Sequence, residues 1–206
     1  IELGLVGSEM CIRDRTHLIR TIVQDARCSG REVQVCALTG CAAVLLECGA
    51  RTVHSWAGIG LASGETDRVI DRVCRNKFKK MAWAKADLLI VDEISMMSKK
   101  LFDILDGIGR KARRNRSKPF GGMQVMFSGD FYQLPPVGDR DEPDTCAFCF
   151  ESRAWNTVFP EVIELKKIYR QSDATYVKML NQIRRGKLSR KSYALLQDRV
   201  CRPPPD

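Results

Sequence analysis

Short apolar runs alternate along the chain with segments in which apolar residues recur at helical spacing. The run at 88–91 is entirely apolar, which is the continuous pattern of a strand buried on both faces of a parallel sheet. In the segment at about 98–115, the apolar residues lie three and four positions apart, as in an amphipathic helix: Leu101, Ile104, Leu105 and Ile108. This alternation predicts an α/β protein with a mostly parallel sheet and helices on both faces.

The same patterns outline the other elements. Predicted strands lie at 33–38, 123–128 and 161–165. Predicted helices lie at about 16–28, 40–47, 66–85, 98–115, 152–158, 173–185 and 189–198, and the segment at 66–85 holds two basic helices. Gly58, Gly60 and Gly64 mark a loop. The charged, proline-containing segment at 138–147 predicts a flexible loop.

Two adjacent carboxylates, Asp92 and Glu93, follow the apolar run at 88–91. Open α/β sheets bind their ligands at the carboxyl ends of the strands, which is where this pair lies. In a nucleotide hydrolase of the phosphate-loop class, the first carboxylate holds Mg²⁺ through its water shell and the second polarises the attacking water. The pair therefore indicates nucleoside triphosphate chemistry. The alternative is an ordinary strand end that leads into a capped helix.

A second motif, at 125–137, repeats this design. An apolar strand is followed by a Gly-Asp pair, then by Gln133 and the rigid turn of Pro135 and Pro136. We expect Gln133 to sense a phosphate at the end of the neighbouring strand, while the two prolines fix the backbone beyond it. The alternative is a proline-rich surface loop. Two strand-end motifs that bring polar groups to one sheet edge favour a ligand site.

Seven sequence motifs follow one another along the chain. They are Thr-Val-His-Ser-Trp-Ala-Gly-Ile-Gly at 52–60, Asp-Glu-Ile-Ser-Met at 92–96, Lys-Pro-Phe-Gly-Gly-Met-Gln at 118–124, Gly-Asp-Phe-Tyr-Gln-Leu-Pro-Pro-Val at 129–137, Phe-Glu-Ser-Arg-Ala-Trp at 150–155, Tyr-Arg-Gln-Ser-Asp at 169–173 and Leu-Asn-Gln-Ile-Arg-Arg-Gly at 180–186. In kind and order they resemble the PIF family of DNA helicases, named for petite integration frequency. The resemblance covers about 16–197. It implies a RecA-like fold of the P-loop NTPase type and a superfamily 1 helicase that moves 5′ to 3′ on single-stranded DNA with ATP and Mg²⁺.

The resemblance also implies partners and a biological setting. The expected partners are single-stranded DNA and DNA duplex junctions, and the expected processes are DNA repair, recombination, and telomere or mitochondrial genome maintenance. The expected location is the nucleus, the mitochondrion or both. Two alternatives stay open: a nucleic-acid-binding module without catalysis, and a RecD-like superfamily 1 ATPase. The second shares Gly-Asp-x-x-Gln-Leu-Pro but is not expected to carry Lys-Pro-Phe-Gly-Gly.

Residue roles follow from the resemblance, position by position. Glu93 and Gln133 are expected to be catalytic together with Arg170, whose guanidinium would reach the γ-phosphate across the cleft. Mg²⁺ is expected at Asp92 and Thr16, and ATP at these two residues and at Gln133 and Arg170. The residues expected along the DNA path are Thr39, Gly40, His54, Ser55 and Pro136. The alternatives are a plain surface position for Arg170 and a structural role for His54.

The family's phosphate-binding motif, Gly-x-x-x-x-Gly-Lys-Ser/Thr, has no match. Aligning Thr16 with the last position of the motif places Arg15 at the lysine and Asp14 at the last glycine. Asp14 adds negative charge where the backbone must approach phosphate, and Arg15 is a planar fork, not a compact ammonium. We therefore expect weak or no ATP binding. Residues 1–15 resemble a translated sequencing adapter, so we interpret them as non-native; a diverged N-terminus is the alternative.

Three segments make up the predicted domain organisation. Residues 1–15 are the non-native segment, and 16–160 form a first RecA-like motor domain that lacks its phosphate loop. Residues 161–206 begin a second motor domain, because the family's later motifs have no match after residue 186. The predicted fold is thus a truncated RecA-like domain. The fragment itself is expected to be inactive.

Charge agrees with a nucleic-acid partner. The chain has 34 Lys and Arg residues against 25 Asp and Glu, a net charge of +9 and a pI near 9.2, which suits a polyanion. The basic run at 110–118 either touches the DNA backbone or is a solvated helix end. No apolar run approaches the roughly 20 residues of a membrane span, so a membrane is not expected as a partner.

Nine cysteines lie mostly within apolar segments, which is typical of buried thiols in a reducing compartment. Cys146 and Cys149 have the spacing of half a zinc site, but no second pair follows at a suitable distance. We therefore interpret them as part of a flap that borders Phe150. Trp56 lies among small apolar residues and is expected in the core, with base stacking on DNA as the alternative for Trp56 and Phe131.

Overall fold

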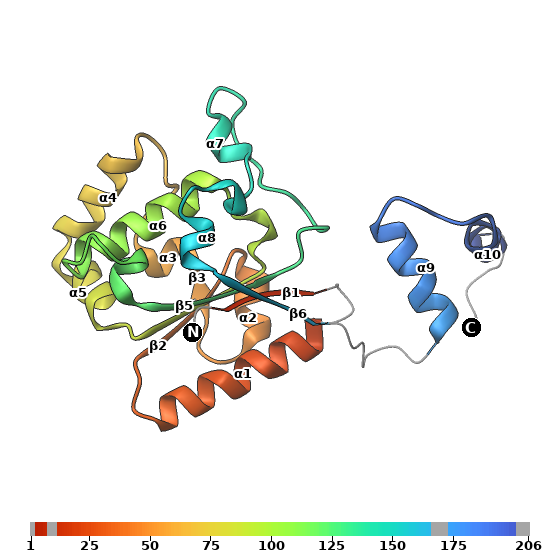
Figure 1. Cartoon of the computed structure of the whole chain (residues 1–206), viewed down its shortest axis with the longest axis horizontal. Coiled ribbons are helices and arrows are strands. Elements are labelled where there is room, and N and C mark those ends of the chain that lie inside the picture. Colours follow the sequence, from red (N-terminus) through yellow and green to blue (C-terminus); the bar gives the residue numbers. More distant parts are fainter. Residues whose placement is uncertain (1–2, 8–11, 166–172, 201–206) are drawn as a thin grey trace. The chain divides into compact units, whose positions relative to one another are not determined.

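A parallel sheet of six strands organises the larger part of the chain in the computed structural model, which describes residues 3–7, 12–165 and 173–200 (Figure 1). The strands are β1 (Leu3–Gly7), β2 (Val33–Ala37), β3 (Arg51–Thr52), β4 (Leu88–Asp92), β5 (Gln124–Gly129) and β6 (Glu161–Leu165). Their order is β3-β2-β4-β5-β1-β6, and every pairing is parallel. The predicted α/β fold with a mostly parallel sheet is confirmed.

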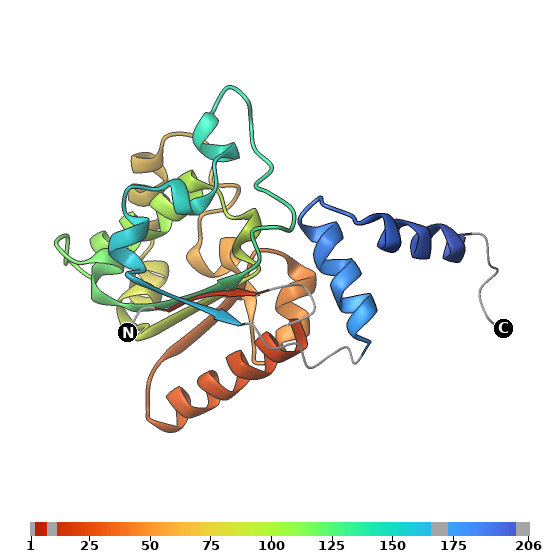
Figure 2. The same ribbon diagram turned by 45° about the vertical axis from the view of Figure 1, so that its right-hand side comes forward.

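Helices cover both faces of the sheet, as predicted (Figure 2). Those of the first compact unit, Ile1–Lys167, are α1 (Ile12–Cys28), α2 (Gly40–Leu46), α3 (Val53–Ala57), α4 (Thr66–Arg75), α5 (Lys77–Lys85), α6 (Lys99–Ala112), α7 (Pro143–Cys146) and α8 (Trp155–Val158). Three 3₁₀ turns accompany them: η2 (Ile94–Met96), η3 (Pro119–Gly122) and η4 (Cys149–Glu151). None of the helices described is long and apolar enough to cross a membrane.

Strand β4 separates two hydrophobic cores. Leu88 and Ile90 pack under α1 and α2, whereas Leu89 and Val91 point to the opposite face, which is covered by α3 to α6 and α8. All five residues of β4 are buried. Side chains of a strand alternate between its faces, so a strand covered on both sides is apolar on both, and in β4 only the last residue, Asp92, is polar. This explains the continuous run seen in the sequence.

Aromatic rings fill the larger core around α6. Phe102 is fully buried, and its ring centroid lies 5.4–6.4 Å from those of four other rings: Phe120, Phe127, Trp155 and Phe159. Tilted and edge-to-face pairs at these distances add to the free energy gained from burial alone. The core thus fixes α6 and η3 against β5, and with them the position of the loops that follow β4 and β5.

The first strand and the end of the first compact unit lie in segments that the predicted domain organisation treats differently. β1 pairs with β5 on one side and with β6 on the other, although 1–15 had been excluded from the fold. Parallel pairing uses main-chain groups, so a short apolar run fits this slot whatever its origin. The non-native origin of 1–15 stays a prediction. The first compact unit extends to Lys167, beyond the predicted boundary at 160, because β6 pairs with β1.

The segment at 138–147 was predicted to be a flexible loop and contains a short helix in the structure. This helix is α7, and two lysines of α6 hold the segment through ion pairs of 2.7 Å each, Lys99 with Asp144 and Lys100 with Glu142. The other predicted elements agree with the structure to within a few residues, except that α1 begins at Ile12 and α6 ends at Ala112. The sequence did not define the short helix α3.

The second compact unit, Ile168–Asp206, consists in its described part of α9 (Ala174–Arg184) and α10 (Arg190–Val200). The Asp173 side chain accepts hydrogen bonds from the backbone N–H groups of Thr175 and Tyr176, at 2.8 and 3.1 Å, and so caps the start of α9. Both helices were predicted from the sequence.

Candidate functional site

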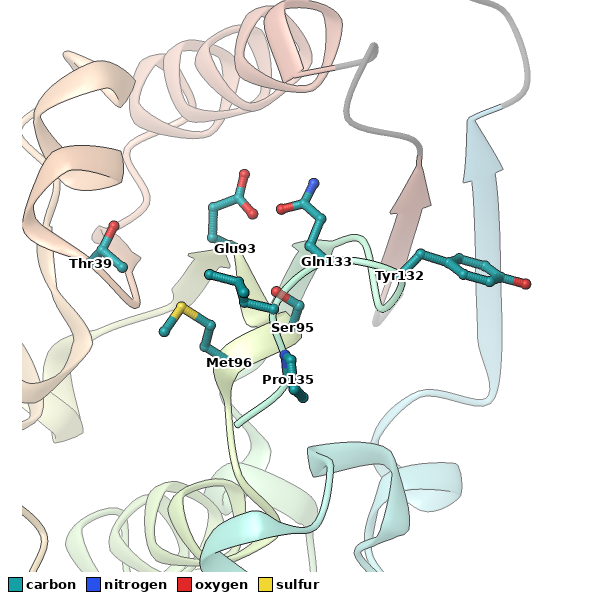
Figure 3. Close-up of a pocket in the computed structure, with 8 residues that line it drawn as sticks. Thr39, Glu93, Ser95, Met96, Tyr132, Gln133 and Pro135 are labelled. Atoms are coloured by element: carbon teal, nitrogen blue, oxygen red, sulfur yellow. The ribbon is translucent and has the colours of Figure 1, made fainter. Parts of the chain in front are cut away.

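A cleft of about 480 Å³ lies at the carboxyl ends of β2, β4 and β5. Its walls come from the N-cap of α2, from the turn after β4 and from the loop after β5: Thr39, Glu93, Ser95, Met96, Tyr132, Gln133, Leu134 and Pro135. Figure 3 shows the polar ends of Glu93 and Gln133 side by side, with Thr39 across the cleft. The two strand-end motifs therefore meet, as their positions after parallel strands predict.

The backbone turns sharply at Glu93, where β4 ends. Glu93 adopts φ 57° and ψ 44°, in the left-handed region that residues with a side chain seldom occupy. Such a conformation costs on the order of 1–3 kcal/mol and is found most often at functional sites. Its effect is to break the strand alternation, so that Asp92 stays buried while the Glu93 side chain enters the cleft.

Arg15 forms a buried ion pair with Glu93. Its Nη2 lies 2.5 Å from Glu93 Oε1, and the side chains of the two residues are 0% and 19% exposed. Burial raises the pKa of Glu93, and the nearby Arg15 charge offsets part of that rise. Arg15 Nε and Nη1 are buried and have no hydrogen-bond partner within the described part of the chain. The arginine aligned with the family's lysine therefore pairs with a carboxylate that lines the cleft, the one expected to be the base.

Asp92 and Gln133 each bring an unsatisfied polar atom to this region. Asp92 is 4% exposed, and neither its Oδ1 nor Nε2 of Gln133 has a partner among the residues that the structure describes. Asp130 shapes the turn that carries Gln133: its carbonyl accepts from Gln133 N at 2.9 Å, and its Oδ1 accepts from Tyr132 N at 3.1 Å. A buried carboxylate oxygen without a donor suits a hydrated cation, and a free amide N–H suits a phosphate oxygen.

Magnesium fits this donor set only with help from other ligands. The described residues contain no group of three or more His, Cys, Asp or Glu side chains that could enclose an ion. Mg²⁺ is commonly held by one or two carboxylates together with waters and phosphate oxygens. Asp92 would supply the carboxylate. Thr16, also expected at the metal, is half-buried in α1 and does not line the cleft.

The residues expected along the DNA path lie in different surroundings. Thr39 lines the cleft beside Glu93, and its hydroxyl caps α2 by accepting from Ala42 N at 3.2 Å. Gly40 and Ser55 are exposed, whereas Pro136 is buried. Its neighbour Pro135 is exposed and lines the cleft. His54 is half-buried on α3, and burial lowers its pKa.

Arg170 lies outside the described residues, so its predicted role stays a prediction. Four residues that line the cleft were not singled out from the sequence: Ser95, Met96, Tyr132 and Leu134. Each lies within three residues of Glu93 or Gln133 along the chain. Their closeness in sequence to these two residues is the signal from which they could have been predicted.

The basic run at 110–118 is largely structural. Arg110 pairs with Asp106 at 2.7 Å, and Lys111 pairs with Asp71. Arg113 Nη1 donates to three carbonyl groups at 2.8–3.3 Å, those of Trp83, Ala84 and Ala86. These contacts fasten α6 to α4 and α5, which favours the structural interpretation for these three side chains. Trp56 is 2% exposed and packs on Trp83, so its predicted place in the core is confirmed.

Comparisons with known proteins match most of this chain. The family described as PIF1-like helicase matches residues 12–193. The ATP-dependent DNA helicase PIF1 of Saccharomyces cerevisiae is 39% identical over 202 residues, which are 97% of this chain and 22% of that protein. The chain thus spans about a fifth of the length of this relative.

Solved structures agree. The Pif1 helicase from Candida albicans has a TM-score of 0.86 and 37% identity, over 98% of this chain and 44% of its own. The Pif1 helicase from Bacteroides, in complex with ADP-AlF3 and single-stranded DNA, has a TM-score of 0.76 and 28% identity, over 95% of this chain and 45% of its own. The RecA-like fold is confirmed, and the matches favour PIF1-like over RecD-like proteins. The chain belongs to the PIF1-like helicase family.

Proposed function

We propose that this chain is the nucleotide-facing part of a helicase that couples ATP hydrolysis to 5′-to-3′ movement on single-stranded DNA and unwinds duplex DNA at junctions. One observation carries the proposal: Asp92, Glu93 and Gln133 meet at a single sheet edge from two separate strand-end motifs. The Bacteroides relative, solved with ADP-AlF3 and single-stranded DNA, supports the same pair of ligands.

The three residues divide the chemistry. Glu93 accepts a proton from the attacking water, and its raised pKa brings this base closer to neutral pH, where proton transfer is more efficient. Asp92, whose buried Oδ1 has no hydrogen-bond partner among the described residues, would hold Mg²⁺ through its water shell. The Gln133 amide donates to a γ-phosphate oxygen, which links its position to the state of the nucleotide. Mg²⁺, when bound, offsets the negative charge of the phosphates.

The Arg15–Glu93 ion pair must open before Glu93 can act as a base. A buried guanidinium that neutralises this carboxylate favours a second candidate function, a nucleic-acid-binding module without catalysis. The two candidates share the DNA partner and differ in ATP turnover. The biological setting proposed for either is DNA repair, recombination, or telomere or mitochondrial genome maintenance, in the nucleus or mitochondrion. The seven cysteines whose side chains are described are free thiols, as a reducing compartment requires.

Calorimetric titration of this chain with ATP and Mg²⁺ tests the nucleotide site. We expect a dissociation constant of about 1 mM or weaker, because Arg15 pairs with Glu93 instead of holding phosphate. A constant of about 1 mM corresponds to a binding free energy of about −4 kcal/mol. Arg15→Lys should tighten binding, since a compact ammonium fits between phosphate oxygens. Arg20→Lys, on the same helix but away from the cleft, is the matched control. Micromolar affinity in the unsubstituted chain would contradict this account of Arg15.

Turnover is tested in a protein that carries a phosphate-binding loop with Gly and Lys at positions 14 and 15 and continues this chain through the second motor domain. Glu93→Gln should abolish phosphate release stimulated by single-stranded DNA while ATP binding persists, because the amide keeps the shape of the carboxylate but cannot accept a proton. If the substituted protein turns over ATP at the original rate, Glu93 is not the base. If no variant turns over ATP yet all bind single-stranded DNA, the non-catalytic candidate holds.

A further inference from the structure

Helix α5 carries two large apolar side chains on its outer surface. Phe78 is 80% exposed and Met81 is 49% exposed. They lie three residues apart on one helix, so their side chains share a face. The opposite side of α5 is anchored in the core by Trp83, which is fully buried and lies 4.5 Å from Trp56, centroid to centroid. The core therefore holds α5 with Phe78 and Met81 turned outward.

The surroundings of this apolar pair are basic. The segment from Thr66 to Lys85 holds seven Lys and Arg residues against two Asp residues, a large share of the excess positive charge of the chain. Lys77 and Lys85 flank Phe78 and Met81 on the same exposed face, and no carboxylate of the described residues forms an ion pair with either lysine. Figure 1 shows α4 and α5 together at one end of the first unit.

Two hydrogen bonds from Lys79 tie α5 to α3. Lys79 Nζ donates to the carbonyls of Ser55 and Trp56 at 2.7 and 3.2 Å, and Trp83 Nε1 donates to the Ala57 carbonyl at 3.3 Å. These contacts satisfy carbonyl groups at the end of α3, which have no partner within that helix. The exposed face of α5 is therefore held in a fixed position next to the helix that carries His54 and Ser55.

We propose that the outer face of α5 is a stacking platform for single-stranded DNA, with one base on the ring of Phe78, Met81 beside it, and the flanking phosphates at Lys77 and Lys85. The inference rests on the proposed DNA partner and adds a contact surface to it. An exposed aromatic ring between unpaired lysines matches the two needs of a single strand, a flat apolar surface for the base and cations for the backbone. Cations around an apolar pair make a protein partner with an apolar core less suitable.

Fluorescence anisotropy with a short labelled oligothymidylate tests the proposal on the whole chain. Phe78→Ala should weaken binding by about 5- to 150-fold, the range for loss of one stacked base, and Phe78→Trp should retain it. The double variant Lys77→Gln/Lys85→Gln should lower the slope of log affinity against log salt by about 1.4, two phosphates at about 0.7 each. Val162→Ala is the matched control, because Val162 is 56% exposed but lies between Glu161 and Glu164.

The indole introduced by Phe78→Trp gives a second readout, since base stacking should quench its fluorescence. Thermal unfolding checks that each variant is folded. We expect this, because the substituted side chains are exposed and contribute little to the core. Three results would overturn the platform: equal affinity of Phe78→Ala and the original chain, equal losses in Phe78→Ala and Val162→Ala, or a Phe78→Ala effect confined to self-association. Those outcomes leave the proposed DNA partner standing, whereas an original chain that binds no oligothymidylate refutes both.

Discussion

Breaking the Arg15–Glu93 ion pair should destabilise the protein, and a double-mutant cycle can measure by how much. The perturbations are Arg15→Met, which keeps an unbranched apolar stem but removes the charge, and Glu93→Gln, which keeps the shape of the carboxylate. Each single variant leaves a buried charge without its partner, and the double variant removes both charges. The pair joins α1 to the turn after β4, 78 positions apart along the chain.

The expected magnitude follows from burial and distance. Charge centres about 4 Å apart attract by about 4 kcal/mol at an effective dielectric constant of 20. Removal of one partner from a buried pair costs about 3–5 kcal/mol, and we expect the lower end because the Glu93 side chain is 19% exposed. Unfolding free energies of domains are about 5–15 kcal/mol, so this loss is a large fraction of stability. The double variant should lose less than the sum of the singles, with a coupling energy of about 2 kcal/mol or more.

Urea unfolding followed by the fluorescence of the three tryptophans measures these free energies. The pH dependence gives an independent check. Burial raises the folded-state pKa of Glu93 above its unfolded value of about 4.5, so Glu93 lowers stability as pH rises through the window between the two values. Loss of the Arg15 charge raises the folded-state pKa further. The deficit of Arg15→Met should therefore shrink as pH falls toward 4.5.

An exposed ion pair provides the control. Arg68 and Glu65 have side chains that are 83% and 73% exposed, and Arg68→Met should cost below about 1 kcal/mol. A coupling energy near zero between Arg15 and Glu93, in variants that unfold cooperatively, would refute the buried pair. So would a deficit of Arg15→Met that stays constant with pH.

Three further substitutions, with Gly40→Ala as a control for the first, test the packing and the titration of the first unit. Gly109→Ala should lower the melting temperature, because the added Cβ would lie 2.8 Å from the Phe120 backbone. This clash should outweigh the helix preference of alanine, which is about 1 kcal/mol over glycine. Gly40→Ala is the control and should not lower the melting temperature, because the space around Gly40 is open. Phe102→Ala should reduce the unfolding free energy by about 3–5 kcal/mol in urea titrations. Burial lowers the pKa of His54, so stability should fall as pH drops from about 6.5 toward the lower folded-state value, and His54→Asn should remove this dependence when unfolding is followed against pH.

Local sequence patterns predicted the fold class and about half of the residues that line the cleft. The apolar run of β4 predicts a strand buried on both faces, since alternation disappears when both faces are covered. Asp92 ends one strand of a parallel sheet, and Glu93 and Gln133 follow strands of the same sheet. Such strands end at one edge, so the sequence places these three residues together without coordinates. Helix boundaries were close because caps such as Thr39 and Asp173 act within a few residues of their own position.

Contacts between distant parts of the chain were decided by the tertiary structure alone. No local signal predicts that Arg15 pairs with Glu93 or that Arg113 donates to carbonyls that precede β4. Nor does the sequence show that Phe78 is exposed on α5 while Trp83 of the same helix is buried. The same holds for β1, whose place between β5 and β6 depends on main-chain pairing that any short apolar run can supply. Local patterns fix which residues form each element, because propensity and periodicity act over a few residues. Which charges meet, and which aromatic ring stays exposed, depends on how those elements pack.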